Sequence, residues 1–85
     1  METKIGGGAV RVLFRVAAKS SVRLGMYDVS GRLVKLLEHG VFAEGNYVST
    51  WDGHDERGFR ARPAVYFLRL DIGGQVFRRT VIWSR

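Results

Sequence analysis

The residues best suited to chemistry lie in one short acidic run. Asp52, Asp55 and Glu56 fall within five positions, accompanied by Gly53 and Gly58. Calcium takes about six to eight oxygen ligands, and an oxygen-rich loop supplies some of them. The spacing differs from the alternating ligands of an EF-hand loop. The alternative, which we favour, is structural: Asp52 caps a turn with its side chain, and the glycines supply special backbone angles.

The two histidines form no recognisable metal or catalytic arrangement. Neither His39 nor His54 has a partner at metal-ligand spacing, and His54 falls in the same polar loop. The chain has no Cys, which excludes thiol catalysis and thiolate metal sites. Paired carboxylates need a cleft to hydrolyse a substrate, and a chain of 85 residues has few walls to build one. The sequence therefore predicts a non-enzymatic protein without a cofactor.

Aromatic residues offer two further binding chemistries. Trp51 and Trp83 would form a sugar-binding platform if they were exposed, but both end strand-like runs, and we expect them in the core. Phe77 next to Arg78 and Arg79 combines stacking with charge, as in nucleic-acid binders. Adjacent residues of a strand point to opposite faces, so these three do not form one patch.

The charge of the chain is strongly basic. The formal net charge is +6, and most of the positive residues are Arg. Such a charge favours acidic partners, among them nucleic acid, lipopolysaccharide and anionic glycans. The arginines are spread along the whole chain, mostly at alternate positions. We therefore interpret them as solvated outer faces that discourage aggregation between strand edges.

The elements that position these residues are predicted to be strands. Helical periodicity is absent, whereas period-two alternation recurs. Val10, Val12, Phe14 and Val16 share one face of residues 10–16, and the other face carries Arg11, Leu13 and Arg15. The same pattern predicts strands at residues 22–28, 31–38, 46–51, 64–70 and 75–83. Residues 31–38 also fit one or two helical turns.

Turn-forming residues separate these strands. Turns are predicted at Ser20-Ser21, at residues 28–31, in the polar loop 52–58 and at residues 71–74. Phe42 is expected to tuck inward from a loop at residues 39–45. Six to seven short antiparallel strands with regular turns indicate an all-β, immunoglobulin-like β-sandwich. A small closed barrel is the structural alternative.

The length allows one domain. Residues 1–8 contain three consecutive glycines and are predicted to be a flexible Gly-rich linker, and residues 9–85 form the sandwich domain. No stretch approaches the roughly 20 apolar residues of a membrane span, and the first residues lack the apolar segment of a signal peptide. We expect the chain to be part of a longer protein. The predicted core consists of alternate residues of the last two strands together with eight residues from the earlier strands. These are Val10, Val12, Phe14, Val16, Leu24, Met26, Tyr47 and Trp51.

Four motifs in a fixed order carry a family resemblance. They lie at residues 27–34 (YDVSGRLV), 45–47 (GNY), 51–58 (WDGHDERG) and 65–70 (VYFLRL), and a basic final strand follows. This order resembles the Ig-like domain named after the flagellar hook-capping protein FlgD. It is equally similar to the C-terminal sorting domains of type IX secretion cargo. The resemblance covers about residues 10–85.

The resemblance implies a seven-stranded sandwich at the carboxyl end of a bacterial secreted or cell-surface protein. A sorting domain would be recognised by the outer-membrane export machinery, whereas a hook-capping relative would be a packing module in an extracellular assembly. The leading prediction is a non-catalytic sorting or surface-attachment module. A structural spacer or assembly module is the first alternative, and a basic nucleic-acid-binding domain is the second.

Protein partners are expected, either the export machinery or a neighbouring domain, and the isolated domain is expected to be monomeric. The protein partners would bind this domain by docking on its surface or by adding a strand to one of its sheets. We place this contact on the last strand, and its predicted residues are Val76, Arg78, Arg79, Trp83 and Arg85.

Overall fold

The computed structural model describes residues 1–84, and these fold into strands joined by turns and by one longer loop at residues 52–63. The strands are β1 (Glu2–Gly6), β2 (Ala9–Val16), β3 (Ser20–Tyr27), β4 (Leu33–Phe42), β5 (Gly45–Trp51), β6 (Ala64–Ile72) and β7 (Gln75–Trp83). Within the described residues, no helix qualifies by length and hydropathy as a membrane-spanning segment.

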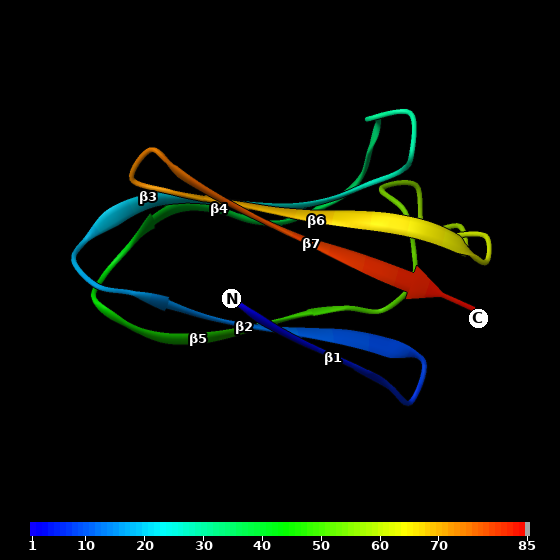
Figure 1. Cartoon of the computed structure of the whole chain (residues 1–85), viewed down its shortest axis with the longest axis horizontal. Coiled ribbons are helices and arrows are strands. Elements are labelled where there is room, and N and C mark those ends of the chain that lie inside the picture. The colour runs from blue at the N-terminus through cyan, green and yellow to red at the C-terminus, as the bar shows by residue number, and fades with distance from the viewer. Residues whose placement is uncertain (85) are drawn as a thin grey trace.

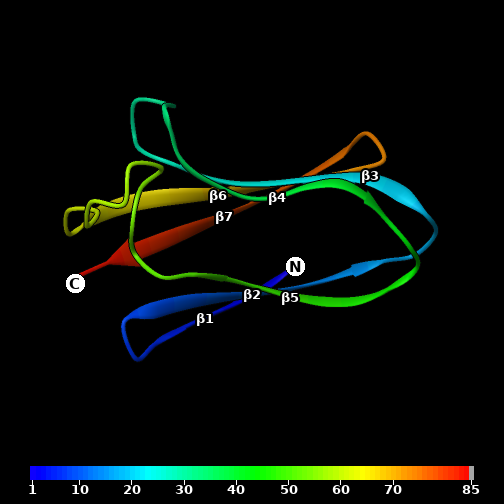
Figure 2. The ribbon, with the colours of Figure 1, turned by 180° about the vertical axis from the view of Figure 1, so that it is seen from behind.

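Two antiparallel sheets pack face to face. One has the order β1-β2-β5 and the other has the order β4-β3-β6-β7. Figure 1 shows the four-stranded sheet as the upper layer and the three-stranded sheet as the lower layer, and Figure 2 shows the same two layers from behind. The predicted all-β sandwich is confirmed. The closed barrel is excluded, because the strands form two separate sheets.

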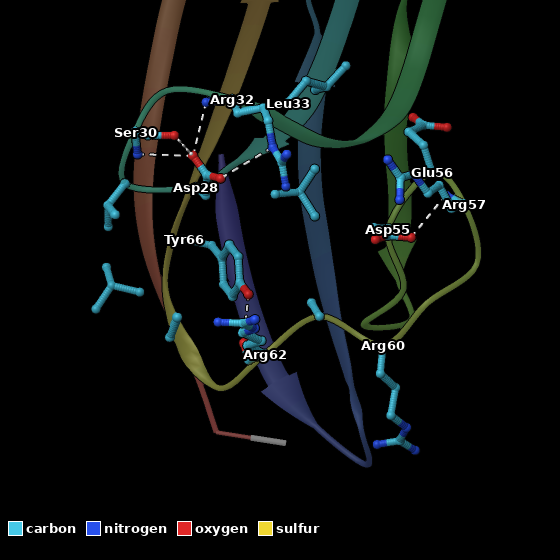
Figure 3. Close-up of a pocket in the computed structure, with 15 residues that line it drawn as sticks. Asp28, Ser30, Arg32, Leu33, Asp55, Glu56, Arg57, Arg60, Arg62 and Tyr66 are labelled. Carbon is cyan, nitrogen blue, oxygen red and sulfur yellow. Dashed lines mark hydrogen bonds and ion pairs between the residues drawn. The ribbon is translucent and has the colours of Figure 1, made fainter.

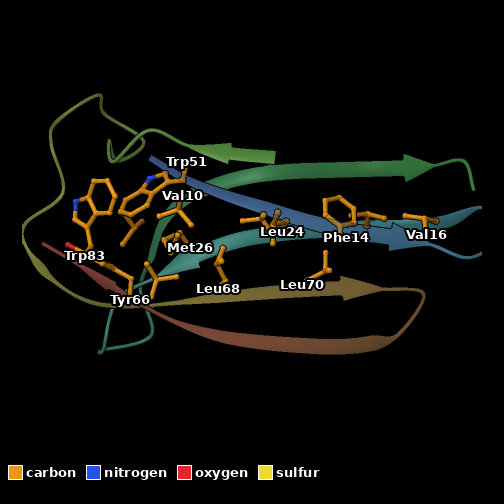
Figure 4. Close-up of a cluster of buried hydrophobic side chains, with 14 residues drawn as sticks. Val10, Phe14, Val16, Leu24, Met26, Trp51, Tyr66, Leu68, Leu70 and Trp83 are labelled. Carbon is orange, nitrogen blue, oxygen red and sulfur yellow. The ribbon is translucent and has the colours of Figure 1, made fainter. Parts of the chain in front are cut away.

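The core lies between the two layers because alternate residues of each strand face inward. In β2, Val10, Val12, Phe14 and Val16 are all buried, as the alternation predicts. The buried side chains line up along the length of the sandwich in Figure 4. Ser49 is the buried polar exception, and its hydroxyl donates a 2.8 Å hydrogen bond to Glu38 Oε2.

Aromatic clusters close both ends of the core. At one end the ring of Trp51 lies 4.8 Å from that of Trp83. At the other end Phe42 and Tyr47 meet edge to face at 4.9 Å, and Phe14 stacks on Tyr47 at 5.6 Å. Trp51 and Trp83 are therefore core residues, as expected, and Phe42 packs inward as predicted. Tyr47 is only half-buried at the margin of the core.

Tyr66 ties the entry of β6 to the preceding loop. Its hydroxyl donates a 2.6 Å hydrogen bond to the carbonyl oxygen of Arg62, four residues upstream. This arrangement matches the tyrosine corner of immunoglobulin-like sandwiches, where a tyrosine near the start of a strand bonds back to the backbone. Burial raises the pKa of Tyr66.

The prediction of a flexible linker at residues 1–8 is wrong. Glu2–Gly6 forms β1 and pairs with β2, for example through Lys4 opposite Arg11. Gly7 and Gly8 form the hairpin turn, with φ angles of 61° and 76°. Two consecutive positive φ angles suit a two-residue hairpin turn whose twist matches the strands, and glycine adopts them without strain. The glycines therefore join two paired strands.

The third predicted strand is longer than expected and contains no helical turn. β4 runs through His39 and Gly40 to Phe42, so the loop predicted at residues 39–45 is reduced to a tight turn. Register shifts in the β3–β4 pairing follow Leu24 and Met26. Such irregularities break the period-two alternation, which explains why the sequence of β4 also fitted a helix. Ser20-Ser21 starts β3 instead of forming a turn.

Candidate functional site

The acidic run holds its own loop together. Asp55 Oδ1 accepts hydrogen bonds from the backbone N–H groups of Arg57 and Phe59, both at 2.9 Å. Asp52 Oδ1 accepts one from the backbone N–H of His54 at 3.0 Å, and this bond lowers the pKa of Asp52. These contacts agree with the structural interpretation of the acidic run, in which Asp52 caps a turn with its side chain.

Glu56 joins the same loop to the free edge of β4. Its backbone N–H donates to the carbonyl oxygen of Val34 at 3.0 Å, and its Oε2 accepts the N–H of Leu36 at 2.6 Å. The loop thereby covers edge groups of β4 that would otherwise be open to another strand. Across residues 1–84, no group of three His, Asp or Glu side chains is arranged to hold a metal ion. The structure thus does not bring Asp52, Asp55 and Glu56 together as a calcium site.

A hollow lies at one end of the sandwich, between the β3–β4 turn and the β5–β6 loop (Figure 3). Its volume is about 810 Å³. Asp28 Oδ1 anchors the turn by accepting hydrogen bonds from Ser30 Oγ at 2.7 Å and from the N–H groups of Ser30 and Arg32 at 3.0 Å. The bond from the Ser30 hydroxyl is the main reason that the pKa of Asp28 lies below its usual value.

The arginines around this hollow do not converge on a common point. Arg32 lies against Asp28, with Nε 3.7 Å from Oδ2. Arg60 points away from Asp28 and Tyr66 in Figure 3. An anion site requires donors aimed at one position. The hollow is therefore better described as the junction of two capped turns.

The residues predicted on the last strand fall on two sides of β7. Val76 and Arg78 are exposed and face outward, away from the other sheet. Arg79 faces the opposite way, and its Nη2 donates a 2.9 Å hydrogen bond to the carbonyl oxygen of Met1. Trp83 is 4% exposed, so its prediction as a contact residue is wrong. Alternation along the strand separates these side chains. Arg85 lies outside the described residues.

Register brings outward-facing residues of three strands together on the four-stranded sheet. Phe67 of β6 lies opposite Tyr27 of β3, and Val65 lies opposite Ile82 of β7. We call this surface the β3-β6-β7 face, and its residues are Tyr27, Val65, Phe67, Arg69, Arg78 and Ile82. In Figure 1 the turn between β3 and β4 rises above one end of this sheet on its outer side, and no further layer of strands from residues 1–84 covers the sheet.

The apolar half of the β3-β6-β7 face is exposed. Val65 and Phe67 are each 38% exposed and Ile82 is 70% exposed, because these positions alternate with the buried Tyr66, Leu68 and Val81. Exposed apolar groups that adjoin one another, in contrast to scattered ones, mark interaction surfaces.

Tyr27 lies flat on this sheet. A Cβ atom at Gly25 would be 3.0 Å from Cε1 of Tyr27 and 3.1 Å from Cδ1 of Leu33, so both side chains cover Gly25. Arg23 Nη1 donates a hydrogen bond to the Tyr27 hydroxyl and holds the ring there. The face therefore presents an ordered aromatic surface, which reduces the side-chain entropy lost on binding.

The other half of the face is basic. Arg69 and Arg78 are directly opposite each other on β6 and β7. Arg69 Nε donates a 3.0 Å hydrogen bond to Asp71 Oδ1, which raises the pKa of Arg69. Within residues 1–84, no ion pair joins Arg78 to an acidic side chain.

Comparison with solved structures agrees with this architecture. The chain aligns with FlgD from P. aeruginosa with a TM-score of 0.64 and 24% sequence identity. The fold is FlgD-like. The alignment covers 87% of this chain and 60% of the FlgD chain. No protein-family model matches the sequence, and no curated protein matches it either.

The FlgD-like fold confirms the part of the resemblance that concerns architecture. At this identity the likeness shows the fold alone, so sorting, partners and location stay predictions. The sequence prediction placed the candidate contact on the last strand alone and did not anticipate that β3 and β6 supply outward-facing residues to the same face. The signal was available in β6, where Val65, Phe67 and Arg69 alternate with core residues.

Proposed function

We propose that the chain is a non-catalytic module of a larger exported bacterial protein, in which it holds a place in an extracytoplasmic assembly. The main support is the distribution of the side chains. Aliphatic and aromatic groups fill the interior from end to end (Figure 4), while the carboxylates of the polar loop bond to backbone groups of the loop and of β4. Such a molecule acts through its surface.

The FlgD-like fold supports the assembly role over the other candidates. By resemblance, a hook-capping relative contributes such a domain as a packing module. The solved FlgD chain is longer than the part that this sandwich matches, which agrees with a module inside a larger protein. On this basis the module acts outside the cytoplasm.

An in-frame deletion tests the module role. We expect a parent protein lacking residues 1–85 to keep its biochemical activity but to be lost from its assembly in the extracytoplasmic fraction. An antibody raised against the domain should detect a product much larger than 9.6 kDa in that fraction. Loss of activity with normal retention, or a 9.6 kDa band in the cytoplasm, contradicts the proposal.

Sorting by a type IX system is a finer version of the same proposal. It is favoured by the basic final strand, where Arg78 is exposed on β7, together with the resemblance to sorting domains. A periplasmic reporter fused to residues 1–85 should reach the surface of a type IX-competent host. Retention of the reporter in the periplasm contradicts the sorting role and is compatible with the assembly role.

A further inference from the structure

We propose that the β3-β6-β7 face docks a protein segment that combines apolar and acidic side chains. This inference rests on the proposed module function and names the surface and the partner chemistry that it uses. The face is composed as interface centres are, because aromatic residues and Arg are enriched there while Lys and Glu are depleted. Tyr27, Phe67, Arg69 and Arg78 supply these residue types within one patch.

The apolar half selects a partner with hydrocarbon side chains. Tyr27, Phe67, Val65 and Ile82 are neighbours by register across three strands, and the Tyr27 ring is held over Gly25. A docking segment removes these groups from water, and this burial of apolar surface favours association. A purely polar polyanion gains nothing from this half of the face.

The basic half selects carboxylates. Like charges directly opposite each other on neighbouring strands destabilise a sheet, and Arg69 and Arg78 stand in this relationship. Asp71 compensates Arg69 at 3.0 Å, while Arg78 has no ion pair within residues 1–84. A carboxylate from a partner would lie against both guanidinium groups and remove the repulsion.

The same charges disfavour a second copy of this chain as the occupant. Each copy carries a net charge of +6, and a symmetric contact through this face would bring Arg69 and Arg78 of both copies into one interface. Like-charge juxtaposition at an interface opposes association. An acidic partner would be attracted by the same arginines that repel a second copy.

Docking on the face is favoured over strand addition at the edge of β7. Arg79 points to the interior side of this edge strand and donates to the carbonyl oxygen of Met1. An inward-pointing charge on an edge strand discourages the pairing of a further strand. A partner therefore meets the outward-facing side chains, whereas the free backbone edge of β7 is protected.

Amide chemical-shift mapping with defined peptides tests the proposal. The probes are three 16-residue peptides composed of Leu, Glu and Ser, of Glu and Ser only, and of Leu, Lys and Ser. We expect only the Leu-Glu-Ser peptide to shift the amides of β6 and β7 in a saturable way. Equal binding of the Glu-Ser peptide, or shifts confined to the β5–β6 loop or to β1-β2-β5, overturns the proposal.

Matched charge reversals sharpen this test. Arg69→Glu/Arg78→Glu should lower the affinity for the Leu-Glu-Ser peptide by at least about tenfold, which corresponds to about 1.4 kcal/mol of binding free energy. Lys4→Glu/Arg11→Glu makes the same change of net charge on the other sheet, where Lys4 and Arg11 are also directly opposite, and should leave the binding unchanged. Equal losses in both double variants overturn the proposal, because they show that binding follows only the net charge.

Phe67→Ser and a nucleic-acid probe complete the test. The substitution should lower the affinity for the Leu-Glu-Ser peptide as strongly as the charge reversal does. Far-UV circular dichroism should show an unchanged fold, because the substituted side chain faces outward. A 16-nucleotide single-stranded DNA that binds the same amides more tightly than the peptide overturns the proposal in favour of a polyanion. The docking proposal and the proposed function can fail separately. If the peptides do not bind the face but deletion of residues 1–85 still releases the parent protein, the module function is retained and only the docking surface is wrong.

Discussion

Gly53 and Trp83 are packed so closely that a Cβ atom on Gly53 would lie 2.5 Å from Cζ2 of Trp83. Trp83 cannot retreat easily, because it is 4% exposed and its ring lies 4.8 Å from that of Trp51. The start of the polar loop is therefore fixed by the aromatic core, and the WDG motif has a structural role at this end of the sandwich.

The variant Gly53→Ala should lower the free energy of unfolding by about 2–4 kcal/mol, because a positive φ and a steric clash act together. Gly53 has a φ of 83°. Urea unfolding followed by tryptophan fluorescence measures the loss. Gly58→Ala is the control, since Gly58 has a φ of 88° but no atom lies within 4 Å of the position its Cβ would take, and this variant should lose only about 1 kcal/mol. Equal losses in the two variants would contradict the packing of Trp83 on Gly53.

The hydroxyl of Tyr66 should stabilise the fold. Tyr66→Phe removes its 2.6 Å hydrogen bond and leaves the Arg62 carbonyl oxygen without this donor. We expect a loss of about 1–2 kcal/mol in denaturant unfolding. Tyr47→Phe removes a similar bond to Ala43 at an exposed site and should cost about 0.5 kcal/mol or less. A larger loss in Tyr47→Phe would rule out a special role for the Tyr66 corner.

Asp28 should make stability depend on pH in the acidic range. Its pKa in the folded protein lies below the usual value of 3.8 for an aspartate, mainly because of the hydrogen bond from the Ser30 hydroxyl. The ionised carboxylate therefore stabilises the fold at pH values above 3.8, and this contribution is lost as the pH falls through the lower, folded pKa. Thermal unfolding between about pH 2 and pH 7 measures the slope. Asp28→Asn should flatten it, and an unchanged slope would show that other carboxylates dominate.

Calcium should leave the melting temperature unchanged. Asp52 and Asp55 bond to N–H groups of their own loop, and Glu56 bonds to the N–H of Leu36. A ligand that binds only the folded state raises the melting temperature, and the rise grows with the logarithm of the ligand concentration above Kd. Scans with calcium and with a chelator should therefore superimpose. A calcium-dependent rise that disappears in Asp55→Asn would restore the calcium interpretation of this loop.

The sandwich could be predicted because its core residues alternate cleanly. Val10 to Val16 of β2 show period two without interruption, and all four apolar residues of that face are buried. The same alternation placed Leu24, Met26 and Trp51 inside. These features are local, and a single strand is long enough to display them.

Features that depend on pairing between strands were missed. The three glycines after Ile5 suggested a linker, although Gly7 and Gly8 form a hairpin turn between two paired strands. β4 follows a broken alternation because the register shifts beside it. The β3-β6-β7 face joins Tyr27 to Phe67 across 40 positions of sequence, and only the register of the sheet shows that they are neighbours.

Retention of the parent protein in its assembly shows whether this module acts through the β3-β6-β7 face. The full-length parent carrying Arg69→Glu/Arg78→Glu should appear in the medium or in the soluble extracytoplasmic fraction, whereas Lys4→Glu/Arg11→Glu should remain in the assembly. Immunoblots of the fractions give the ratio for each variant. If both double variants remain assembled, or both are released to the same extent, the β3-β6-β7 face is not the surface through which this module acts.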